Sequence, residues 1–150
     1  MLPDDVLEGA RLLDAYAGTG AMGIEGLSHG AEWVDFVERD THACKGIRDN
    51  LRDAGLKERA HVYCSTVKKA LDYLSEPYDV VIMDPPYSEP GVPDIVQGLF
   101  DAGLLKRDGV VFVEHAWRDV MPEAVGELKL SKARRYGDTA VSVYREEASV

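Results

Sequence analysis

The chain has 150 residues, 45% hydrophobic and 29% charged, which is the balance of a globular protein rather than a disordered one. Its formal net charge of −10 counts against a nucleic-acid-binding protein, because phosphate contacts need Lys and Arg, although the local distribution of charge matters more than the total. No apolar run has the length of a membrane-spanning helix, and the N-terminus lacks the pattern of a signal peptide. Cys44 and Cys64 form no CxxC pair, so we expect neither a disulfide framework nor a zinc site, and a cytoplasmic location.

Patterns typical of strands and helices alternate through most of the chain. Strands are expected at 11–16, 33–38, 61–64, 78–83 and 109–114, and helices at 21–28, 41–54, 66–74 and 93–102. Two further strands, 128–135 and 139–145, are joined by a short glycine-containing connection, which favours an antiparallel hairpin. The sequence therefore predicts a single α/β domain over residues 1–150, with a doubly wound, mostly parallel, seven-stranded sheet that ends in the hairpin.

A glycine-rich turn follows the first expected strand. Gly18, Gly20 and Gly23 have G-x-G-x-x-G spacing, which lets the backbone turn tightly beside a helix N-terminus but also occurs in plain turns. Asp14 precedes the glycines; its carboxylate would repel a pyrophosphate but suits a cationic amino acid end, such as that of S-adenosylmethionine. Glu38 ends the next strand and can accept both ribose hydroxyls, as at dinucleotide and S-adenosylmethionine sites. The alternative is that both acids are solvated strand ends.

The most specific motif is Asp84-Pro85-Pro86-Tyr87 (DPPY), directly after the apolar strand at 78–83. The two prolines make a stiff turn that presents carbonyl oxygens. The Asp84 carboxylate and the Pro85 carbonyl can accept the N–H groups of an exocyclic base amine and orient its nitrogen toward a methyl donor. Tyr87 offers a flat surface on which the base can stack. A rigid turn with an acidic cap is the alternative.

Other polar residues carry weaker signals. Glu114 ends the fifth expected strand and either orients the Asp84 loop or is an ordinary strand-end acid. Trp117 can stack on RNA, but a half-buried packing role is the preferred interpretation. The histidines lack metal-ligand spacing, so no metal is expected. A basic cluster is interpreted as a solvated face rather than a binding patch: Lys129, Lys132, Arg134 and Arg135.

Together these motifs resemble the bacterial 16S ribosomal RNA guanine-N2 methyltransferases of the small ribosomal subunit. The resemblance covers nearly the whole chain and rests on the segment 13–31, Val37-Glu38-Arg39-Asp40, Asn50-Leu51, DPPY, Val113-Glu114 and Tyr136-Gly137-Asp138-Thr139. It implies a Rossmann-like class I methyltransferase fold that uses S-adenosylmethionine and acts on ribosomal RNA or an assembling small subunit. We also expect a monomer without metal or membrane contact.

The resemblance assigns roles to particular residues. It implies that the target amine lies among Asp84, Pro85, Pro86 and Tyr87, and that the cofactor contacts Asp14, Ala15, Gly18, Thr19, Gly20, Glu38, Arg39, Ser65, Thr66 and Asp84. The chain departs from the family at His29, where an Arg is usual, and at Thr66, where an acid is often found. Only 13 residues precede Asp14, so we expect the chain to lack the basic N-terminal extension of the family.

Three other functions remain open. A dinucleotide-dependent oxidoreductase would share the glycine turn and Glu38, but it leaves Asp14 and DPPY unexplained. An amino-group methyltransferase acting on adenine N6 in DNA or on a protein amide is not excluded by DPPY alone, because many amino-group methyltransferases share that motif. A non-catalytic cofactor-binding module would keep the fold without turnover.

Overall fold

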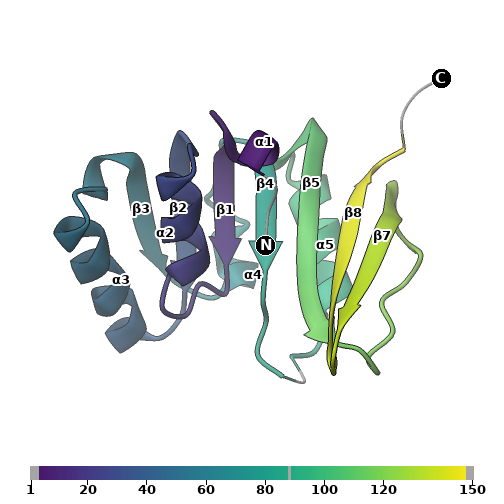
Figure 1. Cartoon of the computed structure of the whole chain (residues 1–150). Coiled ribbons are helices and arrows are strands. Elements are labelled where there is room, and N and C mark those ends of the chain that lie inside the picture. Colours follow the sequence, from purple (N-terminus) through teal and green to yellow (C-terminus); the bar gives the residue numbers. More distant parts are fainter. Residues whose placement is uncertain (1–3, 88, 148–150) are drawn as a thin grey trace.

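The computed structural model describes residues 4–87 and 89–147 as an α/β fold built on one mixed sheet (Figure 1). The elements in chain order are α1 (Asp4–Leu7), β1 (Arg11–Ala15), α2 (Ala21–Ser28), β2 (Trp33–Glu38), α3 (Thr41–Asp53), η1 (Lys57–Arg59), β3 (Ala60–Cys64), α4 (Val67–Ala70), β4 (Tyr78–Met83), α5 (Val92–Asp101), β5 (Leu105–Ala116), β6 (Ala124–Val125), β7 (Leu128–Tyr136) and β8 (Thr139–Glu146). Within these ranges no helix is long and apolar enough to cross a membrane.

The strand order in the sheet is β3-β2-β1-β4-β5-β8-β7-β6. The first five strands are parallel, β8 runs antiparallel to β5, and β7 and β8 form the predicted antiparallel hairpin. The expected seven strands become eight, because Ala124 and Val125 add a two-residue strand beside β7. So short a strand has no periodicity that the sequence could reveal.

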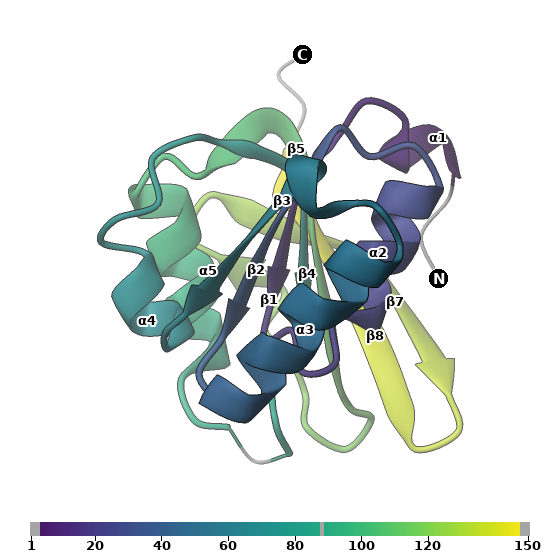
Figure 2. The same ribbon diagram turned by 90° about the vertical axis from the view of Figure 1, so that its left-hand side faces the viewer.

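Helices cover both faces of the sheet, as the view in Figure 2 shows. One core lies between the sheet and α4 and α5, and the other lies between the sheet and α1, α2 and α3. Strands β1 and β4 are almost entirely buried, because each must be apolar on both faces. This doubly wound arrangement changes direction between β1 and β4, where open α/β sheets bind their ligands.

The element predictions differ from the structure mainly at their ends. The helix expected at 66–74 is α4, Val67–Ala70, and the chain then tightens into turns in which the N–H groups of Asp72 and Tyr73 donate to carbonyls three residues back. Strand β5 is longer than expected at both ends, Leu105–Ala116 rather than 109–114. Helix α1 and the η1 turn were not predicted, since both are shorter than two helical turns.

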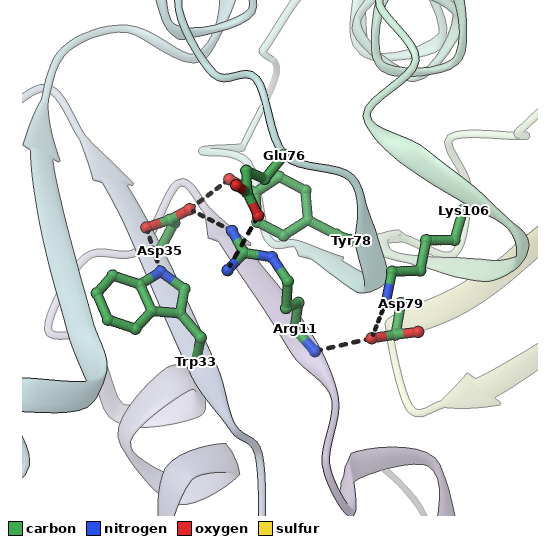
Figure 3. Close-up of polar contacts among 7 residues, drawn as sticks. All are labelled: Arg11, Trp33, Asp35, Glu76, Tyr78, Asp79 and Lys106. Carbon is green, nitrogen blue, oxygen red and sulfur yellow. Dashed lines mark hydrogen bonds and ion pairs between the residues drawn. The ribbon is translucent and has the colours of Figure 1, made fainter.

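A polar network joins the amino-terminal ends of β1, β2 and β4, at the edge of the sheet away from the ligand turns (Figure 3). The carboxylate of Asp35 is buried and accepts the indole N–H of Trp33 at 2.8 Å and the hydroxyl of Tyr78 at 2.5 Å. The guanidinium of Arg11 lies 3.6 Å from the same carboxylate. The buried charge is therefore paired and hydrogen-bonded, which keeps its desolvation cost tolerable.

Candidate active site

The loops that follow β1 and β4 diverge around a cavity of about 1040 Å³ at the carboxyl edge of the sheet. Ala15 pairs with Val37 on one side and with Met83 on the other, so the three parallel strands end at the same level. The residues that come next, Tyr16, Glu38 and Asp84, all line this larger cavity. The sheet topology alone thus brings together acids that are far apart in the sequence.

Each glycine of the turn is needed for a structural reason that the backbone or its neighbours show. Gly18 and Gly20 have φ values of 58° and 80°, in the left-handed region that favours glycine, and Gly20 is the N-cap of α2. At Gly23 a Cβ atom would lie 2.3 Å from the ring of Phe36, so glycine lets α2 pack closely on β2. Tyr16 also has a positive φ, 59°, and such a strained backbone at a non-glycine residue is typical of functional sites.

Glu38 is held by the backbone at the rim of the larger cavity. One carboxylate oxygen accepts the N–H of Gly18 at 2.8 Å, and the other accepts the N–H of Asp40 at 2.8 Å. A carboxylate oxygen has about two lone-pair sites, so each retains one acceptor position. Two acceptors at a fixed spacing suit a vicinal diol.

Asp14 lies beneath the glycine turn and is only 3% exposed. Its carboxylate accepts the N–H of Gly23 at 3.0 Å, which satisfies one of the free N–H groups in the first turn of α2. Burial raises the pKa of Asp14 to about 7, and the nearby carboxylates of Asp84 and Glu38 act in the same direction. A buried acid with acidic neighbours is ready to gain a cationic partner.

A second cavity of about 410 Å³ adjoins the first on the far side of the DPPY loop. Asp84 and Pro86 line both cavities, while Pro85 and Tyr87 line the smaller one. Desolvation raises the pKa of Asp84 to about 6, helped by a hydrogen bond and charge repulsion from the Glu114 carboxyl. Both carboxyl groups belong to the smaller cavity, so a proton or an N–H donor can be shared there.

The comparisons with known proteins identify the family of the chain. Residues 1–145 match the family model described as conserved hypothetical protein 95. The chain belongs to this family. It is 33% identical over 142 residues to "Putative rRNA methyltransferase YlbH" of Bacillus subtilis, which covers 93% of this chain and 77% of the relative. It is 29% identical over 144 residues to "Ribosomal RNA small subunit methyltransferase D" of Escherichia coli, covering 95% and 72%.

The fold is similar to that of solved class I methyltransferases. A structure titled "Putative methyltransferase yhhF from Escherichia coli" superposes with a TM-score of 0.88 at 27% identity and covers 97% of this chain and 81% of its own. A conserved hypothetical protein of Streptococcus pyogenes superposes with a TM-score of 0.88 at 29% identity and covers 93% of this chain and 88% of its own. The resemblance inferred from the motifs is therefore confirmed, and so is the α/β methyltransferase fold, with eight strands in place of seven.

Most of the expected cofactor residues line the larger cavity, but Asp14, Ala15 and Gly20 do not. Among the described residues that line it are Gly18, Thr19, Glu38, Arg39, Ser65, Thr66 and Asp84. Asp14 and Ala15 lie beneath the loop and are buried, and Gly20 serves as the helix N-cap. Thr66 is also an N-cap, since its hydroxyl accepts the N–H of Lys69 at 3.2 Å, which explains why a hydroxyl residue stands there.

Sequence reasoning missed the contribution of the segment leading into α5. Glu89 and Gly91 line both cavities, and Asp94 and Ile95 line the larger one. The only available signal was their position shortly after DPPY. In the described part of the chain, no group of three or more His, Cys, Asp or Glu side chains is placed to hold a metal.

The two cysteines meet behind this site, although 20 residues separate them. The Sγ atoms of Cys44, on α3, and Cys64, at the end of β3, lie 2.7 Å apart, and both thiols are free. The Cys44 thiol also donates to the Glu38 carbonyl at 3.1 Å. Burial raises the pKa of Cys44 to about 12, so this thiol is a packing group and not a nucleophile.

Proposed function

We propose that this chain transfers a methyl group from S-adenosylmethionine to the exocyclic N2 amine of a guanine in 16S ribosomal RNA. The observation that supports this most is the pair of cavities that meet at Asp84 and Pro86. A methyl donor in the larger cavity and a base in the smaller one would come together at Asp84 and Pro86, where the two cavities meet. A ribosomal RNA substrate places the proposed reaction in the cytoplasm.

The residues of the larger cavity fit S-adenosylmethionine. We assign the two remaining acceptor positions of Glu38 to the ribose hydroxyls. Asp14 lies beneath the glycine turn and does not line this cavity, so we assign it an electrostatic attraction on the ammonium end of the amino acid moiety rather than a lining contact. Gly18, Thr19 and Arg39 would contact the same ligand on the glycine-turn side, and Ser65 and Thr66 would flank the adenine. When bound, S-adenosylmethionine supplies an electrophilic methyl group on a positively charged sulfur.

The DPPY loop provides the groups that prepare the target amine. An exocyclic amine on a base is a poor nucleophile, because its lone pair is delocalised into the ring. The Asp84 carboxylate and the Pro85 carbonyl accept hydrogen bonds from the two N–H groups, which favours the pyramidal nitrogen and aims its lone pair at the methyl carbon. Tyr87 stacks on the base, and Pro86 keeps the turn rigid. The departing sulfide is neutral, so the amine proton is lost to Asp84 or to water after transfer.

The choice of ribosomal RNA over other amines rests on the relatives, both of which are named as rRNA methyltransferases. The curated protein from Escherichia coli is named for the small subunit. Adenine N6 in DNA and a protein amide present the same kind of nitrogen to the DPPY loop. Substrate selection must therefore come from surfaces outside the smaller cavity.

Methyl transfer to three classes of substrate tests this proposal. The chain is incubated with isotope-labelled S-adenosylmethionine and with unmodified 16S ribosomal RNA, duplex DNA or a glutamine-containing peptide, and the digested products are analysed by mass spectrometry. We expect label in N2-methylguanosine from the RNA only, and loss of at least a hundredfold in rate for Asp84→Ala. Label in N6-methyladenine or in the peptide would replace the substrate assignment. Unlabelled products throughout, from a chain that binds the cofactor, would favour a non-catalytic module.

A further inference from the structure

Two exposed aromatic rings, each paired with an arginine, lie in or next to segments that line the smaller cavity. Tyr87 is 69% exposed, and the guanidinium of Arg118 lies over its ring at 5.7 Å from the centroid. Trp117 is 45% exposed, and the guanidinium of Arg135 lies over its ring at 4.9 Å. Two cation–π pairs thus stand at the end of the sheet where the proposed target base enters.

The fold brings Trp117 and Arg135 together although they are 18 residues apart. Ala116, at the end of β5, pairs with Thr139, at the start of β8, so the hairpin turn lies beside the segment after β5. The N–H of Trp117 donates to the carbonyl of Asp138 at 2.7 Å and fixes this segment on the turn. Figure 1 shows the tip of the β7–β8 hairpin at the same edge of the sheet as the carboxyl ends of β1 and β4. Ala116 and Thr139 both line the smaller cavity.

The charge distribution also singles out this region. Residues 117–147 contain six Lys and Arg and six Asp and Glu, so the net charge of −10 is carried by the rest of the chain. Strand β7 has four basic residues and no acidic one: Lys129, Lys132, Arg134 and Arg135. All four are exposed. A polyanion that approaches this protein meets the least repulsion along β7.

We propose that Trp117, Arg135 and the adjoining basic strand β7 form an RNA-docking surface that binds the nucleotides flanking the target base. The inference rests on the proposed function and extends it from the reacting base to its neighbours. An unpaired flanking base stacks on the Trp117 ring, and the Arg135 guanidinium pairs with the next phosphate. For Trp117 and for the basic cluster, this proposal takes the RNA-binding alternative that the sequence analysis weighed but did not prefer.

Equilibrium binding of an unmodified 16S ribosomal RNA transcript, measured over a range of salt concentrations, tests the surface. We expect Trp117→Ala to weaken binding roughly tenfold with an unchanged salt slope, and Trp117→Phe to retain most of the affinity. Arg135→Gln should lower the slope of log K against log salt by about 0.7–0.9, the value of one lost phosphate contact. Lys57→Gln also removes one positive charge, but it lies on η1, next to the outermost strand β3 on the other side of the sheet from β7. This control should leave the affinity and the salt slope as in the wild-type chain.

The same samples separate this inference from the proposed function. Binding of S-adenosylhomocysteine and the thermal midpoint are measured for each variant and should match the wild-type values. If Trp117→Ala and Arg135→Gln bind the transcript as tightly as the wild-type chain, the docking surface is refuted, even when N2-methylguanosine is formed. If they lose affinity as expected but the wild-type chain forms no N2-methylguanosine, the surface stands and the guanine-N2 assignment falls.

Discussion

Replacing Asp14 by Asn separates the stability of the fold from its ability to bind a cation. Burial raises the pKa of Asp14 from 3.8 to about 7, with further repulsion from Asp84 and Glu38. At pH 8 the group is ionised in both the folded and the unfolded chain, so the folded state bears the cost of the buried charge. A shift of about three pKa units corresponds to roughly 4 kcal/mol, at about 1.4 kcal/mol per unit. Asn removes the charge, and its amide oxygen can still accept the N–H of Gly23.

The sign of the pH dependence follows from this raised pKa. Between pH 4 and pH 7 the folded chain keeps a proton on Asp14 that the unfolded chain has lost, so wild-type stability falls as the pH rises. We therefore expect Asp14→Asn to raise the free energy of unfolding by about 2–4 kcal/mol at pH 8, and by less than half as much at pH 5. The same variant should bind S-adenosylhomocysteine at least tenfold more weakly at pH 8, because the ammonium partner is lost.

Urea unfolding followed by circular dichroism at pH 5 and pH 8, together with calorimetric titration, measures both effects. Asp72→Asn is the matched control, since it removes an exposed acid of the same cavity and should change stability by less than about 0.5 kcal/mol. The reasoning is refuted if Asp14→Asn destabilises the chain equally at both pH values. It is refuted as well if the variant binds the ligand as tightly as the wild-type chain.

Three further changes test the site and its support. Glu114→Gln removes the like charge that helps to raise the pKa of Asp84. The acid limb of the pH–rate profile for methyl transfer, expected near pH 6, should therefore move to lower pH. A limb that does not move would contradict the pairing of the two carboxyl groups. Gly23→Ala should lower the free energy of unfolding in urea by about 1–3 kcal/mol, because the new Cβ atom would overlap an aromatic ring. Gly46→Ala, which lies in open space within α3, should raise it by up to about 1 kcal/mol. Equal effects of the two substitutions would refute the packing argument. Tyr78→Phe should cost roughly 1.5–3 kcal/mol by removing a hydrogen bond to a buried carboxylate, and a neutral change in the unfolding midpoint would contradict the role given to this network.

The sequence predicted the features that depend on local pattern. The apolar strands, the glycine turn and the DPPY loop follow from periodicity and residue type, and the parallel topology then places Glu38 and Asp84 at one edge. Contacts between residues of different helices and strands could not be predicted in this way. The contact of Cys44 with Cys64 and the stacking of Arg135 on Trp117 depend on strand register, which local pattern does not reveal.

Burial of polar groups was equally hidden from local pattern. Asp14 was predicted at a strand end near a ligand, but the alternation of β1 turns it toward α2, where it caps a backbone N–H beneath the turn. The positive φ of Tyr16 has no counterpart in residue type, since tyrosine has no preference for that region. The lining supplied by α5 arises because the helix packs beside the cavity, which is a consequence of tertiary structure.

Calorimetric titration of the wild-type chain with S-adenosylhomocysteine and, in parallel, with NAD tests the central claim most directly. Both ligands have an adenosine whose ribose Glu38 can hold, but only S-adenosylhomocysteine carries an ammonium group for Asp14. NAD would bring a pyrophosphate against Asp14 and Asp84, two acids whose pKa values are already raised by desolvation. The account predicts saturable binding of S-adenosylhomocysteine with one site per chain and no measurable binding of NAD. A folded chain that binds NAD and leaves S-adenosylhomocysteine unbound would contradict it.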